Sequence, residues 1–339
     1  MAHLFLQFYN NNKARTDLDE IMLANGFRNI AVGSSCRSKA GIFLAKIATL
    51  AIMPLRIQRG DVLLIQYPFK KYYTTLCRVA HRRGAKVVTL VHDLGCFRRK
   101  KLTVQQEVAR LDHTDVLIVH NESMAQFLSS HGYRRPMVTL GIFDYLATPL
   151  ATTPTKRADE PWTVVYAGGL AKRKSTFIYL LDAVIEGWKM FVHGRGLDEE
   201  EARSWRNVES RGFIRSDDFV RESVGHFGLV WDGISIDECA GQWGEYLRVN
   251  NPHKTSFYLR AGKPVIMWDK AALTPFVMRE GVGVAVSSLR DIGHKLNEIS
   301  ADDYAQMCRN VERVSALLAD GHYFKTAFAA AMERLNDNH

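Results

Sequence analysis

The sequence predicts an α/β protein that consists of two domains, each built on a parallel sheet covered by helices. Three observations lead to this prediction. Short apolar runs alternate with longer helix-like segments, the alternation breaks once near the middle of the chain, and it then resumes. Alternation of this kind is typical of βαβ units, whose strands run parallel.

The first half of the chain contains six apolar runs of strand length. They lie at residues 4–8, 29–32, 62–66, 86–91, 116–119 and 137–140. The segments between them are long enough for the helices that connect parallel strands. We therefore expect residues 1–150 to form the first domain.

The alternation breaks between about residues 147 and 161, where Ala, Thr, Pro and charged residues have the composition of a linker. It resumes with runs at 163–167, 190–192, 227–231, 265–268 and 283–286, which we assign to a second domain at 151–318. The segment 302–336 has helical spacing without a strand. We expect it to pack across both domains, with 319–339 returning to the first one.

The length and composition agree with a globular protein of two domains. A chain of 339 residues exceeds the size at which one hydrophobic core usually stops growing. With 47% hydrophobic and 24% charged residues, disordered, collagen-like and disulfide-stapled classes are excluded. The net charge of +9 predicts an anionic partner, unless the basic runs at 98–101 and 172–174 are merely solvated faces.

Three features concern the cellular compartment. The five cysteines are widely spaced without a Cys-x-x-Cys pair, which favours a reducing compartment. The chain begins with an apolar run rather than with the basic segment of a signal peptide, so we expect a cytoplasmic protein. The most apolar stretch, 42–57, is too short and too charged to span a membrane. We predict a buried helix there, with a helix lying on the inner face of the membrane as the alternative.

The most informative segment is Asn-Asn-Pro-His-Lys-Thr-Ser at 250–256. Asn251 is a suitable N-cap and Pro252 a suitable first helical residue, so the helix should open with free N–H groups and a positive dipole end. Such a start is a cradle for a diphosphate. The predicted contacts are Asn250, Asn251, Lys254, Thr255 and Ser256. The alternative is a capped helix with a surface lysine.

Glycines and polar residues also follow the other strands of the second domain, where parallel sheets bind ligands. The predicted contacts are Gly168, Gly169, Lys172, Arg173, Gly194, Phe213 and Asp232. Lys172 and Arg173 are suited to a diphosphate, Phe213 to a nucleotide base and Asp232 to a sugar hydroxyl. The alternatives are structural: a tight turn at the glycines, a core position for Phe213 and a turn cap for Asp232.

In the first domain, His92 and Asp93 follow the strand at 86–91 and suit general-base work on an acceptor hydroxyl. A turn-capping Asp93 beside a hydrogen-bonded His92 is the alternative. The amides at 10–12 stand where a dinucleotide enzyme carries glycines, which argues against a dehydrogenase. Asp17 and Asp19 match an Asp-x-Asp metal motif but lie in a helical pattern. We therefore predict no metal site and no cofactor besides the donor substrate.

These motifs resemble those of the GT-B fold glycosyltransferases, in particular the bacterial group of β-1,6-galactofuranosyltransferases and of glucosyltransferases that extend glycans on serine-rich adhesins. The resemblance covers nearly the whole chain, and its most specific parts are 250–266, Val-His-Asp at 91–93 and Gly-Leu-Val-Trp-Asp-Gly at 228–233. It implies two Rossmann-like domains that face a cleft, a UDP-sugar in the second domain and a glycan or lipid-linked oligosaccharide acceptor in the first. It also implies that Lys254, Lys172 and Arg173 hold the diphosphate without a metal ion. The chain lacks the paired-glutamate signature of other GT-B groups.

The predicted function is transfer of a hexose, either galactofuranose or glucose, from a UDP-sugar to a glycan hydroxyl, with inversion and with Asp93 as the base. A non-catalytic or regulatory nucleotide-sugar-binding protein is the alternative. Peripheral membrane association and a homo-oligomer stay open. Nucleic acid is not expected, because the basic residues follow strand ends instead of lining one helix.

Overall fold

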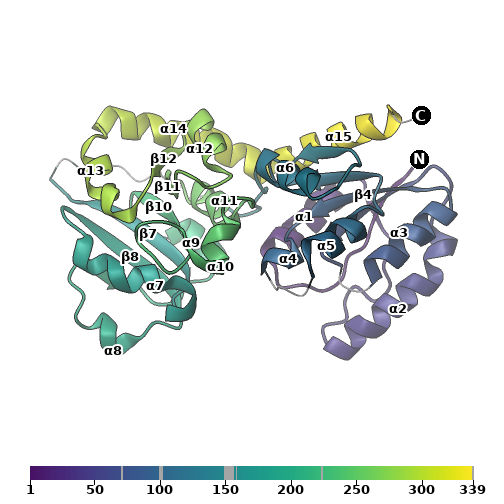
Figure 1. Cartoon of the computed structure of the whole chain (residues 1–339), viewed down its shortest axis with the longest axis horizontal. Helices are drawn as coiled ribbons and strands as arrows, with labels where there is room; N and C mark the ends of the chain where they lie inside the picture. The colour runs from purple at the N-terminus through teal and green to yellow at the C-terminus, as the bar shows by residue number, and fades with distance from the viewer. Residues whose placement is uncertain (70–71, 99–101, 149–155, 158, 223, 338–339) are drawn as a thin grey trace. The chain divides into compact units, whose positions relative to one another are not determined.

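The computed structural model describes all residues except 70–71, 99–101, 149–155, 158, 223 and 338–339. Parts of the expected linker and of the basic run at 98–101 therefore lie outside the described residues. The chain forms two compact units, Met1–Asp144 with Gly321–His339 and Tyr145–Asp320. Each unit contains one six-stranded parallel sheet with its helices (Figure 1), so the predicted α/β class is confirmed.

Unit 1 has the strand order β2-β1-β3-β4-β5-β6. Its strands are β1 (His3–Phe5), β2 (Arg28–Asn29), β3 (Val62–Tyr67), β4 (Lys86–Val91), β5 (Val116–Val119) and β6 (Met137–Thr139). Its helices before the linker are α1 (Lys13–Ala24), α2 (Lys39–Arg56), α3 (Tyr73–Arg82), α4 (Gly95–Arg98), α5 (Val104–Leu111) and α6 (Glu122–Ser130). The central strands β3, β4 and β5 are mostly apolar and almost fully buried, because both faces of a parallel sheet are covered.

Strand β1 is shorter than the apolar run at 4–8 that predicts it. The backbone N–H of Gln7 donates to the side-chain oxygen of Asn29 at 3.1 Å, and so does that of Ala31 at 2.9 Å. The Asn29 carboxamide thus replaces the ladder beyond Phe5. A side chain that competes for backbone hydrogen bonds ends the strand.

Unit 2 has the strand order β12-β11-β10-β7-β8-β9. Its strands are β7 (Trp162–Gly169), β8 (Trp188–Arg195), β9 (Val208–Ser210), β10 (Phe227–Val230), β11 (Val265–Trp268) and β12 (Gly283–Val286). Its helices are α7 (Lys172–Leu181), α8 (Glu199–Ala202), α9 (Ser216–Glu222), α10 (Gly241–Tyr246), α11 (His253–Arg260), α12 (Thr274–Glu280), α13 (Ile292–Asn297) and α14 (Ala301–Asp320).

Strands β7 and β8 extend beyond their predicted ends, so the structural alternative of a tight turn at Gly168, Gly169 and Gly194 is wrong. Gly168 pairs with Gly194, and Gly169 pairs with Arg195. A Cβ at Gly194 would lie only 1.9 Å from the carbonyl oxygen of Gly168. Gly194 is therefore needed because the two strand ends approach each other closely, and not because the chain turns there.

The last helix, α15 (His322–Asn336), belongs to unit 1 and contacts β5 and β6. Gly321 precedes it with a left-handed φ of 70°, and a Cβ there would lie 2.7 Å from Ile21. The Asp144 carboxylate accepts the N–H groups of Tyr323 and Phe324, which caps the helix. The fold thus joins the end of the chain to its first part.

The prediction of a buried helix at 42–57 is wrong in its burial. The helix exists as α2, but only Ala45, Thr49 and Met53 are buried in it. Within the described residues, α2 and all other helices are too short or too polar to cross a membrane.

Candidate functional site

The carboxyl edge of the unit 2 sheet gathers most of the predicted donor contacts. Strands β7, β8 and β10 run parallel, so their last residues lie at one edge. Gly168 and Gly169 end β7, Asp232 follows β10, and helix α11 begins with Lys254 in its first turn. This is the edge at which open parallel sheets bind ligands.

Lys254 is the centre of this edge. Its Nζ donates to Asp232 Oδ1 at 2.9 Å and to the hydroxyl of Tyr166 at 2.9 Å. Burial alone would lower the pKa of Lys254, but the negative charge of Asp232 and the contact with Tyr166 raise it above its ordinary value. The side chain of Lys254 is 18% exposed. A charged ammonium is therefore fixed in one place, in a side chain that is only partly exposed.

The start of α11 differs by one residue from the prediction. Pro252 is the N-cap, with φ −67° and ψ 123°, and the helix begins at His253. The proline ring sets φ to a value that suits both extended and helical backbone, and here the extended ψ places Pro252 outside the helix. Asn251, expected as the cap, is buried one position earlier. Lys254 is thus the second helical residue, among the N–H groups without an intrahelical acceptor.

Several buried polar atoms near this helix start make no hydrogen bond within the described part of the chain. Among them are the Oγ1 of Thr255 and the Oδ1 of Asn250. Thr255 and its neighbour Ser256 are fully buried. Buried polar atoms in native proteins are normally satisfied, so such atoms mark a place where a ligand or water is expected.

The basic residues of α7 differ in what they contact. The ammonium of Lys172 lies 3.4 Å from Asp198 and also contacts Glu201, so it is paired with carboxylates. Arg173 is exposed and forms no ion pair among the described residues. Lys174 lies over Gly169: a Cβ there would be 3.5 Å from Lys174 Cδ. Of the three, Arg173 rather than Lys172 offers its charge to a ligand at this edge.

Phe213 lies beside the end of β8, because the N–H of Gly194 donates to the carbonyl of Gly212 at 3.0 Å. Its ring is 55% exposed and lies under the guanidinium of Arg195, whose Cζ is 4.1 Å from the ring centre. The alternative of a core position for Phe213 is therefore wrong. An exposed ring with one face open to solvent is a suitable surface for stacking a base.

His92 and Asp93 follow β4 in unit 1. His92 is buried and its ring stacks on Phe143 at 5.4 Å. The Gln66 amide donates to Asp19 Oδ1 at 2.6 Å, so its oxygen accepts the proton on Nε2 of His92 at 2.7 Å. This chain of hydrogen bonds fixes the orientation of the imidazole. Asp93 is more exposed than His92, which favours Asp93 as the group that meets an acceptor.

The Asp-x-Asp pair in α1 is occupied within the fold. Asp17 accepts from Lys13 at 2.9 Å, and Asp19 accepts from Gln66. Burial raises the pKa of Asp19 to about 7, although the charge of Arg15 and the hydrogen bond from Gln66 act against this shift. Within the part of the chain that the structure describes, no group of three or more His, Cys, Asp or Glu side chains is placed to hold a metal ion.

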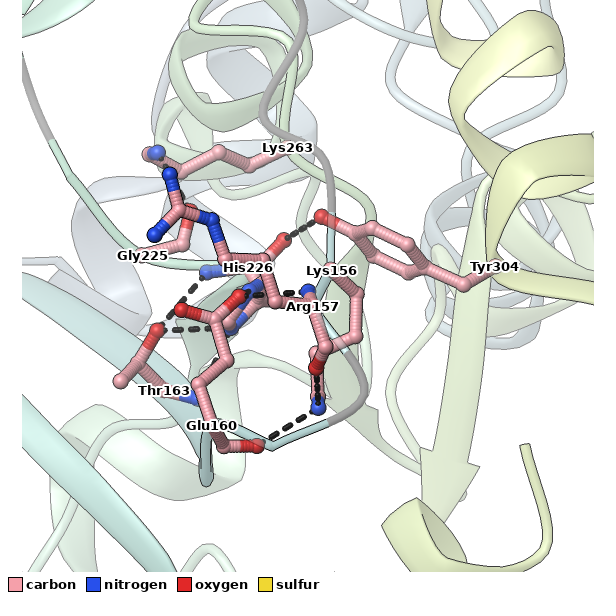
Figure 2. A network of polar contacts seen from close by, with 8 residues as sticks. All are labelled: Lys156, Arg157, Glu160, Thr163, Gly225, His226, Lys263 and Tyr304. Atoms are coloured by element: carbon pink, nitrogen blue, oxygen red, sulfur yellow. Dashed lines mark hydrogen bonds and ion pairs between the residues drawn. The ribbon is translucent and has the colours of Figure 1, made fainter. Parts of the chain in front are cut away.

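Figure 2 shows a second polar cluster, at the amino ends of β7 and β10. Nδ1 of His226 accepts the N–H of Thr163 at 3.1 Å, so Nε2 carries the proton and donates to Glu160 at 3.1 Å. The hydroxyl of Tyr304 in α14 donates to the His226 carbonyl at 3.1 Å. These bonds tie two strands to a helix. Since they lie at the amino ends of the strands, the cluster is not part of the candidate site.

Several residues of the candidate site escaped the sequence analysis. Tyr166, Arg195 and Trp243 contribute contacts, the last as a ring 5.4 Å from Lys174 Nζ. Tyr166 carried a signal, because a tyrosine inside a fully apolar strand needs a partner for its hydroxyl. The others carried none, since their partners are distant in the sequence.

Comparison with protein families places both parts of the chain in one group. Residues 7–142 match the description "Glucosyltransferase 3-like, N-terminal domain", and residues 164–331 match "Glucosyltransferase 3-like, C-terminal domain". The chain is 29% identical to the β-1,6-galactofuranosyltransferase WbbI of Escherichia coli over 328 residues, which cover 95% of this chain and 94% of that protein. It is 23% identical to glucosyltransferase 3 of Streptococcus gordonii, with 82% of this chain and 81% of that protein covered.

Solved structures show the same fold at low sequence identity. The Anabaena protein HepE, solved in complex with UDP, has a TM-score of 0.66 and 13% identity, with 98% of this chain and 100% of that chain covered. The lipopolysaccharide outer core galactosyltransferase WaaB has a TM-score of 0.62 and 12% identity, with 97% and 99% covered. The chain therefore has the GT-B fold and belongs to the glucosyltransferase 3-like family of glycosyltransferases.

Proposed function

We propose that this glycosyltransferase moves a hexose from a UDP-sugar to a hydroxyl of a glycan, without a metal ion and with inversion. The observation that carries the proposal is the Lys254 ammonium, held by Asp232 and Tyr166 at the start of α11. The names of the relatives support galactofuranose and glucose as the sugars to test first. The complex of HepE with UDP supports UDP as the nucleotide.

In the proposed donor site, the diphosphate lies at the N-terminus of α11. Lys254 and the first-turn N–H groups stabilise the negative charge that grows on UDP as the sugar leaves. Asp232 neutralises part of the charge of Lys254, so the exposed Arg173 supplies the positive excess. The unsatisfied Oγ1 of Thr255 is a further group to bond a phosphate or ribose oxygen. Lys172 has no part in this proposal, because Asp198 and Glu201 occupy its ammonium.

The exposed ring of Phe213 is the proposed platform for the uracil base, and Gly168 and Gly169 allow the sugar and phosphate to approach the backbone. In unit 1, Asp93 removes the proton of the acceptor hydroxyl. The oxygen then forms a bond to the anomeric carbon while the bond from that carbon to the phosphate oxygen breaks, and UDP leaves with the electron pair. His92, fixed by Gln66, orients the segment that carries Asp93.

The test combines binding and turnover. Purified protein should transfer a hexose from UDP-galactofuranose or UDP-glucose to a glycan acceptor, with the same rate in EDTA. Lys254→Met should weaken UDP binding in calorimetry by about tenfold to a hundredfold, since a hydrogen bond to a charged group contributes about 1.5–3 kcal/mol. Asp93→Asn should keep the affinity for UDP and lose about a hundredfold or more in kcat.

Two controls make the result specific. Lys172→Met should change UDP affinity by about fivefold at most, because its exposed ion pairs contribute little. The double variant Lys254→Met/Asp232→Asn leaves no uncompensated carboxylate, so affinity that stays low in it is due to the lost ammonium. Unchanged UDP affinity in Lys254→Met would overturn the phosphate assignment. UDP binding without transfer to any glycan would favour the non-catalytic alternative.

A further inference from the structure

Helix α2 exposes several of its large apolar side chains and buries few residues. Phe43, Leu44, Ile47 and Leu55 have exposed fractions of 45%, 63%, 43% and 86%. The buried side of the helix consists of Ala45, Thr49 and Met53. A helix that packs only against its own domain shows the opposite pattern. The outer side of α2 is therefore an apolar surface, here called the α2 surface.

The exposed positions form one stripe along the helix. Leu44, Ile47, Ala51 and Leu55 are separated by three or four residues, so they lie on one side of α2. The helix has 18 residues and spans about 27 Å. Because it is too charged to cross a bilayer, a stripe of this length can contact lipid only with the helix axis along the membrane surface.

The charge around the α2 surface has one sign. From residue 21 to residue 92 the sequence contains twelve Lys and Arg residues, and Asp61 is its one carboxylate. Asp61 is buried and accepts the N–H groups of Ala2 and Gln58, so it offers no negative charge to a partner. The net charge of the whole chain is +9, so this segment carries a larger net positive charge than the chain as a whole.

Basic residues stand at both ends of the stripe. Arg37 and Lys39 precede its apolar part, and Arg56 and Arg59 follow it, all with exposed side chains. Among the described residues, none of the four forms an ion pair with a carboxylate. Helix α3 contacts α2 (Figure 1), and its last turn with the next residue adds Arg82 and Arg83. Apolar side chains flanked by cations match the acyl and headgroup layers of an anionic bilayer.

We propose that the α2 surface docks this glycosyltransferase on an anionic lipid bilayer, with Phe43, Leu44, Ile47 and Leu55 among the acyl chains and the flanking Arg and Lys side chains on the headgroups. A second copy of the chain fits this surface less well. A two-fold contact of the α2 surface with itself would place like charges opposite each other, which costs binding energy. A lipid surface supplies the opposite charge instead.

The test is co-sedimentation of the full chain with large vesicles. The protein should bind vesicles of mixed phosphatidylglycerol and phosphatidylcholine about tenfold or more tightly than vesicles of phosphatidylcholine alone, and added salt should weaken the binding. Leu44→Gln/Leu55→Gln should lower the partition onto the anionic vesicles by about tenfold or more, because two exposed leucines no longer enter the acyl layer. Arg37→Gln/Lys39→Gln should reduce binding to anionic vesicles only.

The matched control is Leu180→Gln/Met278→Gln, which removes two exposed apolar side chains from α7 and α12 of unit 2 and should leave vesicle binding unchanged. All four leucine and methionine positions are exposed, so circular dichroism should show the wild-type fold in each variant. Equal partition of the wild type and of Leu44→Gln/Leu55→Gln would overturn the proposal. So would a wild-type dimer in sedimentation velocity that this double variant abolishes, because the α2 surface would then bind a second copy.

Discussion

At the scale of single residues, Lys263 shows how burial makes stability depend on pH. Its side chain is fully buried, and its Nζ donates to the carbonyl of Gly225 at 2.7 Å (Figure 2). Burial lowers its pKa from 10.5 to about 7. Between these two values the unfolded chain binds a proton that the folded chain does not bind, so stability increases with pH in this range. Below pH 7 the folded chain also carries the charged Lys263, and the full desolvation cost of this buried ammonium lowers the free energy of unfolding.

We therefore expect the free energy of unfolding of unit 2 to rise between pH 7 and about pH 8.5 by up to about 1.4 kcal/mol per pH unit. All six tryptophans lie between residues 162 and 268, so their fluorescence during denaturation reports on unit 2. The range ends near pH 8.5, because above this pH the Cys308 thiol lowers the stability as the pH rises. Burial raises the pKa of Cys308 to about 11, so the unfolded chain loses this proton before the folded chain does.

Lys263→Met should remove this rise, whereas Lys295→Met, which loses an exposed bond to Glu298, should keep it. A Lys263→Met protein whose stability rises with pH as in the wild type would show that Lys263 is charged in the folded state.

At the scale of elements, the packing of α11 on β10 fixes the position of Lys254. Gly228 of β10 lies under the ring of Tyr258, and a Cβ there would be 2.2 Å from Tyr258 Cγ. The hydroxyl of Tyr258 accepts the N–H of Ala167 at 2.7 Å, next to the strand end at Gly168. One ring thus connects the helix that carries Lys254 with the strand that carries the predicted glycines.

Gly228→Ala should displace α11 and lower the stability of unit 2 by about 1–3 kcal/mol, as overpacking of a core does. UDP affinity should fall together with stability, because the displacement moves Lys254 away from Asp232 and Tyr166. Tryptophan fluorescence during denaturation and calorimetry with UDP measure the two effects. Wild-type values in both would show that the helix does not depend on close contact at Gly228.

At the scale of the whole molecule, unit 1 is made from two separate parts of the sequence. Helix α15 brings Phe324 and Phe328 to Phe27, whose ring centre is 4.8 Å from that of Phe328. Phe324 is 1% exposed. Helix α15 is therefore part of the core of unit 1.

Phe324→Ala should lower the stability of unit 1 by about 3–5 kcal/mol through the cavity it leaves. Hydrogen exchange should accelerate in β5 and β6, which α15 contacts, while the tryptophan transition of unit 2 stays at its wild-type position. Thr326→Ala, at an exposed position of the same helix, is the control and should change neither. A loss of stability confined to unit 2 would contradict the division of the chain.

The sequence by itself determined the α/β class and most strands, because the alternation of apolar runs and helices is local. The predicted bounds of β4, β5, β11 and β12 are those of the structure. It also determined that many candidate residues lie at or just after strand ends, since a parallel sheet places all its strand ends at one edge. The motif at 250–256 marked the start of α11 to within one residue.

Only the tertiary structure decided which of these residues meet. Lys254 contacts Tyr166, 88 positions away, and Asp232, 22 positions away, whereas Lys172 is taken by Asp198 and Glu201. These pairings depend on the strand order β10-β7-β8, which no local pattern contains. For the same reason, the sequence could not show that the apolar side of α2 is exposed. Hydrophobic spacing shows that a helix has an apolar face, but the neighbouring elements decide whether that face is covered.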